Sequence, residues 1–152
     1  MRSARAMGGA QGDRFLGPQY TRSAMTAPTL TLDVLDDELA VCRLPIDAPV
    51  PNWAWLGELT SITSTDDELS LVCDANSVPS DVTHTAGWRA FKVRGPLDFG
   101  LVGILAGISG ALADAGVSIF AISTYDTDYI LVPGNQLEAA VNALSTAGYE
   151  VA

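Results

Sequence analysis

The residues that could support nucleophilic or metal chemistry are few in this chain of 152 residues. There is one histidine, His84, and there are two cysteines, Cys42 and Cys73. His84 has no second histidine or cysteine at ligand spacing, so no metal site is predicted, and a serine-histidine-aspartate mechanism would depend on His84 alone. Phosphate-binding, dinucleotide-binding, Cys-x-x-Cys and Gly-x-Ser-x-Gly motifs are absent. The sequence therefore predicts no cofactor and no enzymatic activity.

Two polar segments in the second half have the residue types of a binding site. Asp98–Val102 is predicted to open a helix, with Asp98 as N-cap and Gly100 leaving backbone amides uncovered for a carboxylate or phosphate. Ser123–Asp128 turns from one strand into the next, where Asp128 could hold an ammonium or guanidinium group. Together they would suit the two ends of an amino acid. Simple helix capping and a solvated acidic turn remain the alternatives.

The elements that must position these segments follow from hydrophobic periodicity. The expected order is strand 88–94, helix 99–115, strands 117–125 and 128–132, helix 137–147 and strand 149–152. Gly116 and Gly148 are placed to end the two helices, and Asn135 with Glu138 has the spacing of a capping box. This β-α-β-β-α-β order predicts an α+β, ferredoxin-like module.

The first half is predicted to consist mainly of strands. Leu30–Leu35 and Leu39–Leu44 flank an acidic turn and are expected to form a β-hairpin. Pro45, Pro49 and Pro51 then leave room for a short turn at most. The fold class expected is thus two ferredoxin-like modules, the first with a shortened helical part.

The two halves also resemble each other. Residues 61–72 (SITSTDDELSLV) align without a gap with residues 121–132 (AISTYDTDYILV), at an offset of 60, which predicts a duplicated hairpin. Coincidence between two strands that flank an acidic turn is the alternative. We expect an N-terminal module over residues 28–80, a linker over 81–87 and a C-terminal module over 88–152.

Charge is distributed unevenly along the chain. The formal net charge is -10, with 8 basic and 18 acidic residues. Four of the basic residues lie in the first 27 positions, which are predicted to be a disordered and dispensable tail; a weak likeness to an organelle transit peptide is the alternative. The acidic remainder argues against nucleic acid, and no apolar run reaches the roughly 18 residues of a membrane span. Without a secretory signal, a cytoplasmic location is expected.

The segments WRAFKVRG and LDFGLVGILAGISGALADAGVSIFAISTYDTDYILV resemble the ACT domains, in particular those of tandem-ACT proteins. That group includes small bacterial proteins with elements similar to SITSTDDELSLVC, and is similar to the eukaryotic cytosolic arginine sensors and the regulatory region of aspartokinase. The likeness spans residues 88–145, is weaker over 29–79 and does not extend to the tail.

The resemblance implies a regulatory βαββαβ module that binds an amino acid at an interface between two such modules. Carried over to the matching positions, the implied ligand-binding residues are Asp98, Gly100, Leu101, Val102, Ser118, Ile119, Thr124, Tyr125 and Asp128. The first module has far fewer residues for its own helix, so a composite site would require a homodimer. An acidic pocket suits arginine or lysine, although other ACT modules bind neutral amino acids.

Three functions are compatible with these residues. The first is a non-enzymatic amino-acid sensor whose ligand acts allosterically, by binding one association state better than another. The second is a protein-protein interaction or dimerisation module without a ligand. The third, an enzyme with Asp98 and Asp128 as acid and base, lacks an accompanying nucleophile or metal.

Overall fold

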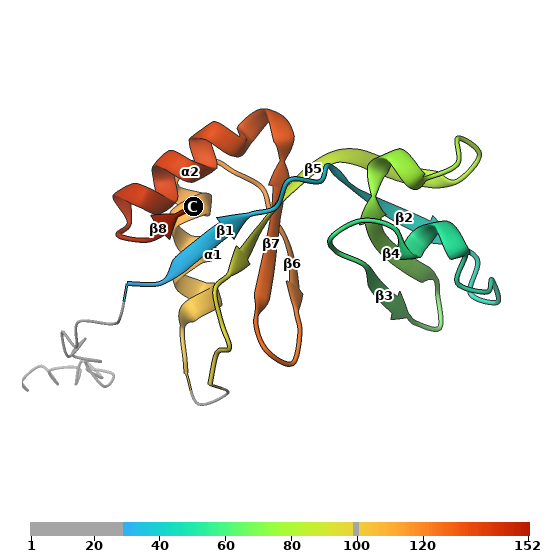
Figure 1. Ribbon diagram of the computed structural model, residues 1–152, viewed down its shortest axis with the longest axis horizontal. Helices are drawn as coiled ribbons and strands as arrows, with labels where there is room; N and C mark the ends of the chain where they lie inside the picture. Colours follow the sequence, from blue (N-terminus) through green and yellow to red (C-terminus); the bar gives the residue numbers. More distant parts are fainter. Residues whose placement is uncertain (1–28, 99–100) are drawn as a thin grey trace, which may run out of the picture.

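The computed structural model describes residues 29–98 and 101–152 (Figure 1). Within these ranges lie eight strands, namely β1 (Thr31–Val34), β2 (Leu39–Leu44), β3 (Ser61–Ser64), β4 (Leu69–Asp74), β5 (Thr83–Val93), β6 (Phe120–Ser123), β7 (Asp128–Pro133) and β8 (Glu150–Val151). The helical elements there are α1 (Ile104–Asp114), α2 (Leu137–Thr146) and the short 3-10 turns η1 (Asn52–Trp55), η2 (Ala75–Ser77) and η3 (Gly134–Gln136). No helix in these ranges is long and apolar enough to cross a membrane.

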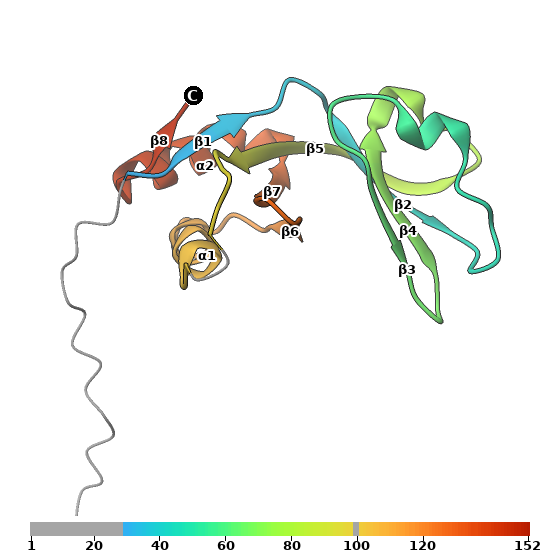
Figure 2. The same ribbon diagram turned by 60° about the horizontal axis from the view of Figure 1, so that its bottom comes forward.

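Strand β5 joins the two parts of the molecule, as Figure 2 shows. Its first half pairs antiparallel with β2, and its second half pairs with β1 on one edge and β7 on the other. The sheet order is β3-β4-β2-β5-β1-β8, and β7 and β6 extend it from the second half of β5. The part built on β2, β3 and β4 is called the first module below, and the part that carries α1 and α2 the second module. The fold is α+β, as the sequence predicts.

The hairpin expected between residues 30–35 and 39–44 is wrong. Strand β1 pairs antiparallel with β5, with Leu32 opposite Val93, and parallel with β8, with Leu32 opposite Val151. The acidic turn after β1 is held instead by Glu58, whose carboxylate accepts from the backbone amides of Asp36 and Asp37 at 2.9 and 3.2 Å. The first module is therefore inserted between two neighbouring strands of the second.

Residues 81–87 were expected to be a linker, but residues 83–87 form the first half of β5. Their backbone is paired with β2, with His84 opposite Cys42 and Thr85 opposite Val41. This segment does connect the modules, but as part of a strand. Pairing with β2 gives hydrogen-bond partners to the backbone N–H and C=O groups of this segment, which explains why a polar stretch forms a strand.

The start of the first predicted helix also differs from expectation. Helix α1 begins at Ile104, not at residue 99, and its N-cap is Gly103 with φ 82°. Asp98 is not the N-cap; its carbonyl accepts from the Leu101 amide at 2.9 Å in a turn that precedes the helix. The left-handed backbone at Gly103, which suits glycine, breaks the helical path that the apolar spacing had suggested.

The ends of both helices are as predicted, whereas the capping of α2 at its start is not. Gly116 and Gly148 follow the C-caps of α1 and α2, with φ 72° and 95°. The capping box of Asn135 and Glu138 is wrong, because α2 starts after the turn η3 and its N-cap, Gln136, makes no side-chain capping bond.

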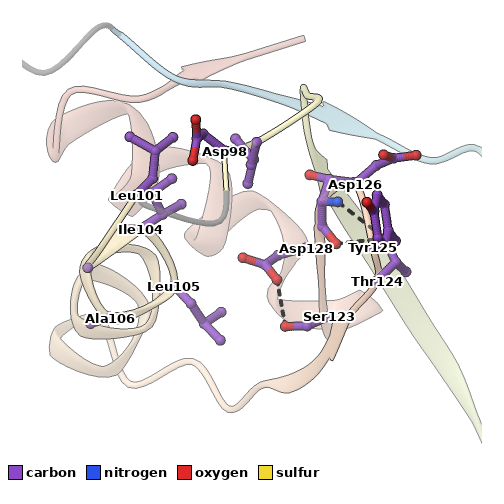
Figure 3. Close-up of a pocket in the computed structure, with 13 residues that line it drawn as sticks. Asp98, Leu101, Ile104, Leu105, Ala106, Ser123, Thr124, Tyr125, Asp126 and Asp128 are labelled. Carbon is purple, nitrogen blue, oxygen red and sulfur yellow. Dashed lines mark hydrogen bonds between the residues drawn. The ribbon is translucent and has the colours of Figure 1, made fainter.

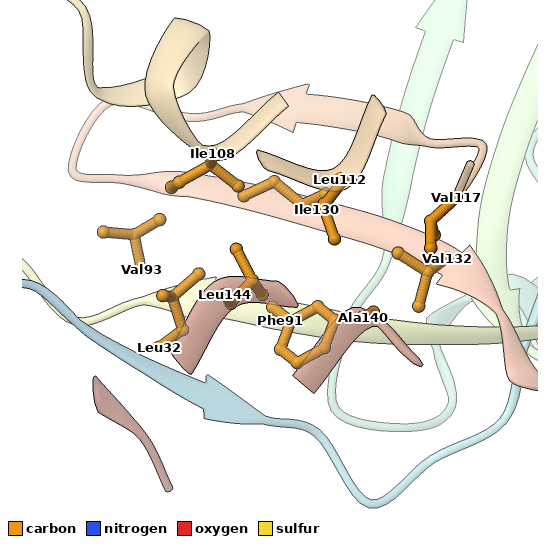
Figure 4. Close-up of a cluster of buried hydrophobic side chains, with 10 residues drawn as sticks. All are labelled: Leu32, Phe91, Val93, Ile108, Leu112, Val117, Ile130, Val132, Ala140 and Leu144. Atoms are coloured by element: carbon orange, nitrogen blue, oxygen red, sulfur yellow. The ribbon is translucent and has the colours of Figure 1, made fainter. Parts of the chain in front are cut away.

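The second module has a core between its two helices and one face of the sheet (Figure 4). Ile108 and Leu112 of α1 and Leu144 of α2 are fully buried there against Phe91 of β5. Burial of each such side chain contributes about 1.5–3 kcal/mol. The opposite face packs against the first module through a cluster of Leu39, Leu59, Val72, Ala90 and Leu131. The modules therefore share one apolar contact in addition to their common strand.

Both cysteines lie in the core of the first module, as the β pattern around them suggested. Cys42 and Cys73 are buried and are not joined by a disulfide. Burial raises the pKa of the Cys42 thiol to about 12 and also raises the pKa of Cys73. Both thiols therefore stay protonated near neutral pH and act as small apolar side chains.

The two hairpins have the same geometry, but the offset between them is 59 residues and not 60. Each has a four-residue loop, over residues 65–68 and 124–127. The loop begins in both cases with a threonine whose amide donates to the carbonyl of the fourth residue, from Thr65 at 3.0 Å and from Thr124 at 2.8 Å. The turns η2 and η3 follow at the same offset. A slip of one residue moves every side chain to the other face, so the match of Ile62 with Ile122 is not structural.

Candidate ligand site

A pocket of about 370 Å³ lies between the start of α1 and the β6–β7 hairpin (Figure 3). It is lined by Leu97, Asp98, Leu101, Gly103, Ile104, Leu105, Ala106, Ser123, Thr124, Tyr125, Asp126, Thr127 and Asp128. Eight of these residues come from the two segments that the sequence singled out, 98–102 and 123–128, and the others lie next to the first segment or in the first turn of α1. The strand register thus brings them together on the second module.

The hairpin loop is held in shape by its own hydrogen bonds. The hydroxyl of Thr124 donates to the carbonyl of Thr127 at 2.8 Å, and the Thr127 amide donates to the Thr124 hydroxyl at 3.2 Å. Such reciprocal side-chain and backbone bonds are typical of Ser/Thr turns. The conformation of the loop is therefore stabilised by bonds within the loop itself.

Further contacts fix this loop to the rest of the second module. Thr127, only 6% exposed, donates its hydroxyl to the carbonyl of Val93 at 2.5 Å. The amide of Leu97 donates to the carbonyl of Asp126 at 2.8 Å. A Cβ at Gly95 would lie 3.1 Å from that same carbonyl, so the chain passes close to the loop there. The segment before α1 and the hairpin loop, which both line the pocket, are thus joined by a backbone hydrogen bond.

The pocket is acidic on one side and apolar on the other. Among the described residues, its lining includes three aspartates and no lysine, arginine or histidine. Of these, Asp128 is directed toward α1 in Figure 3, whereas Asp126 points away from the helix. Ser123 donates its hydroxyl to Oδ1 of Asp128 at 2.5 Å. The apolar side comes from Leu101, Ile104 and Leu105, so the pocket suits a cation on an aliphatic stem.

The first turn of α1 supplies groups of opposite polarity. Gly103, Ile104, Leu105 and Ala106 line the pocket, and the first intrahelical bond of this turn runs from the Gly107 amide to the Gly103 carbonyl. The preceding amides have no acceptor within the helix, and the N-cap Gly103 makes no side-chain capping bond. A helix start of this kind favours a carboxylate. The predicted anion-binding helix start is therefore several residues later than the sequence suggested.

The structure brings five of the predicted site residues together in the pocket, namely Asp98, Leu101, Thr124, Tyr125 and Asp128. Val102 is 93% exposed and does not line it. Ser118 is exposed outside the pocket, and Ile119 packs against the core of the second module. Gly100 lies outside the described residues. The role of each in binding stays a prediction.

Sequence reasoning missed part of the lining. Ile104 and Leu105 lie in the first turn of α1 and pack against the core of the second module, and they line the pocket as well. Ser123 and Asp126 belong to the polar run that was singled out, but nothing distinguished them from their neighbours. Ser123 lines the pocket because it is paired across the hairpin with Asp128, which lines it too. In the described part of the chain, no group of three or more acidic, histidine or cysteine side chains could hold a metal ion.

Comparison with known families agrees with this fold. The ACT-domain family model matches residues 83–146, and a second model, described only as an N-terminal domain, matches residues 37–81. The chain belongs to the ACT-domain family. It is similar to the solved structure of Atu0741 from Agrobacterium tumefaciens, with 39% identity, a TM-score of 0.78, and 83% of this chain and 94% of that chain covered.

Two further similarities extend the comparison. The chain is 37% identical over 84 residues to the cytosolic arginine sensor for mTORC1 subunit 1 of Rattus norvegicus, covering 50% of this chain and 25% of the sensor. It thus spans about a quarter of the length of that relative. The regulatory subunit of aspartate kinase from Thermus thermophilus shares the fold, with a TM-score of 0.50, 14% identity, and 75% and 96% of the two chains covered.

Proposed function

We propose that the protein is a non-enzymatic regulatory protein that senses an amino acid, bound in the pocket between α1 and the β6–β7 hairpin. The observation that carries this proposal is the polarity of the pocket. Asp126 and Asp128 lie on the hairpin, and Asp128 is directed toward the first turn of α1, which lies opposite (Figure 3). A zwitterion with a positively charged end meets both features. The similarity to proteins named as cytosolic arginine sensors supports this proposal. It also supports a cytosolic location for this chain.

The ligand class that fits best is a basic amino acid such as arginine or lysine. Its carboxylate would lie at the amides of α1, and its side-chain cation would meet Asp128. The methylene stem would lie on Leu101, Ile104 and Leu105. A charge-assisted hydrogen bond of this kind contributes about 1.5–3 kcal/mol.

A second copy of the chain completes the site in this proposal. All lining residues belong to the second module, so the first module of the same chain does not close the pocket. Three large apolar side chains near its mouth are exposed, namely Leu101 (52%), Val102 (93%) and Tyr125 (80%). Burial of such side chains between two copies would stabilise a homodimer and exclude water from the ligand.

A thermal-shift screen with the twenty amino acids at millimolar concentration tests the proposal. A ligand of the native state raises the melting temperature by mass action. We expect arginine or lysine to raise the melting temperature. Asp128→Asn should lower the apparent affinity for that amino acid about tenfold or more, and so reduce the shift. The matched control is Asp66→Asn, in the exposed loop of the first hairpin, which should leave the shift unchanged.

The same screen separates the sensor from an interaction module without a ligand. The exposed apolar side chains at the pocket mouth favour that second function if no amino acid shifts the melting temperature. Sedimentation of the full chain with and without the amino acids would then show association that is independent of ligand. A dimer that forms only with ligand would support the sensor.

A further inference from the structure

We propose that Ser123 is a specificity-determining residue of the pocket, and that it favours a primary ammonium over a guanidinium group. The inference rests on the proposed function, since it concerns the same pocket. It names the ligand class more narrowly, as an amino acid whose side chain ends in an ammonium group, such as lysine or ornithine.

The first step is the placement of the two side chains. Ser123 is the last residue of β6 and Asp128 the first of β7, and they are direct partners in the antiparallel register. Side chains of such partners lie on the same face of a sheet. Figure 3 shows both on the side of the hairpin that faces α1, with Leu105 across the pocket. Ser123 is therefore part of the wall that a ligand cation would meet.

The second step is the hydrogen-bond capacity that remains. A serine hydroxyl has a single proton, and Ser123 donates it to Oδ1 of Asp128 at 2.5 Å. The hydroxyl oxygen keeps its lone pairs, and Oδ2 of the carboxylate keeps its own. The pair thus offers acceptors on two different side chains, with one carboxylate oxygen already in use.

The third step is the geometry of the two possible cations. A guanidinium group binds a carboxylate best through two parallel N–H donors, one to each oxygen, and Ser123 competes for one of these oxygens. An ammonium group has three donors in tetrahedral directions, so it can bind Oδ2 of Asp128 and the Ser123 oxygen together. The pair is better matched to the ammonium group.

The first hairpin provides a matched control. At the offset of 59 residues Ser64 corresponds to Ser123, and the partner of Ser64 across that hairpin is Leu69, not an acid. Replacing Ser64 removes a hydroxyl from the same position of an equivalent hairpin without touching the pocket.

Isothermal titration of the full-length protein with lysine and with arginine tests the inference. We expect lysine to bind more tightly to the wild type, and Ser123→Ala to lower the lysine-to-arginine affinity ratio about tenfold. Ser123→Thr keeps a hydroxyl and should restore the ratio, and Ser64→Ala should leave it unchanged. Tighter binding of arginine to the wild type, or an unchanged ratio in Ser123→Ala, would overturn the inference.

A second measurement keeps the inference testable if no amino acid binds and the proposed function fails. Ethylammonium and methylguanidinium chlorides are titrated separately into labelled protein, and the amide signals of Ser123 and Asp128 are followed by NMR. Larger shifts with ethylammonium that disappear in Ser123→Ala would support the preference. Equal shifts, or larger shifts with methylguanidinium, would contradict it.

Discussion

The two hairpin loops of this protein share their internal bonds but differ in their surroundings. Thr65 and Thr124 hold their loops with the same bonds to the fourth loop residue. Around the second loop, α1 and the preceding segment form a pocket, whereas none of the residues of the first loop lines that pocket. The loop alone is therefore a structural unit, and the pocket depends on what is packed beside it.

The length of the connection before each hairpin explains the difference. Residues 45–60 link β2 to β3 and contain only the turn η1, whereas residues 94–119 link β5 to β6 and contain α1. The longer connection returns beside its own hairpin and is bonded to it through the carbonyl of Asp126. The pocket beside the second hairpin thus depends on the connection that contains the helix.

Loss of packing under α1 should have the largest effect. Leu112 lies on the buried face of α1 and is fully buried, so Leu112→Ala should lower the free energy of unfolding by about 2–5 kcal/mol. The matched change in the helix-poor connection is Leu56→Ala, because Leu56 is 55% exposed and its loss should cost less than about 1 kcal/mol. Urea denaturation monitored by circular dichroism measures both. Equal costs would mean that the first connection is packed as tightly as the second.

The anchoring of the second loop should have the next largest effect. Thr127→Val keeps the shape of the side chain but leaves the carbonyl of Val93 without its donor, which should lower the free energy of unfolding by about 1–3 kcal/mol. Thr127→Ser retains the hydroxyl and should restore most of this loss. The same denaturation experiment decides, and a valine variant as stable as the wild type would show that the bond contributes nothing.

A glycine in α1 should have a smaller effect of the opposite sign. A Cβ at Gly110 would meet no atom within 4 Å, so Gly110→Ala should raise the free energy of unfolding by about 0.5–1 kcal/mol through helix propensity. At Gly107 the added Cβ would lie 2.6 Å from Oη of Tyr149, so Gly107→Ala should not show this gain. Thermal melts of the two variants give the comparison, and equal gains would refute the close approach.

The smallest effect is expected at the equivalent of Thr127 in the first loop. Glu68 forms an exposed ion pair with Arg43, with an Nε to Oε2 distance of 3.2 Å. Exposed pairs contribute little, so Glu68→Gln should change the free energy of unfolding by less than about 0.5 kcal/mol. A loss as large as that of Thr127→Val would mean that the two loops are anchored equally well.

Local features of the fold were predictable from the sequence, whereas long-range pairing was not. The glycines at the ends of α1 and α2 and the strands around both acidic turns follow from spacing and residue type. The partner of β1 does not, because residues 30–44 carry the pattern of a hairpin whichever strands they join. The packing of Leu32 in the core of the second module distinguishes pairing of β1 with β5 from a hairpin of β1 with β2.

The candidate site was predictable to the level of two segments, but not of individual atoms. The residue types of Asp98 and Asp128 pointed to the two segments that line the pocket. The position of that start depends on the backbone of Gly103, and the offset between the hairpins depends on loop length. The expected helix start and the expected hairpin offset differ from the structure by only a few residues and by one residue. Hydrophobic periodicity does not locate an element that closely.

The insertion of the first module between β1 and β5 has a consequence for the order of folding on the ribosome. Strand β1 is synthesised before the rest of the sheet, yet one neighbour begins at Thr83 and the other at Glu150. The strands β2, β3 and β4 can pair while β1 is still without both neighbours. Among the described strands, the sheet can therefore be completed only after β8, the last of them, has been synthesised.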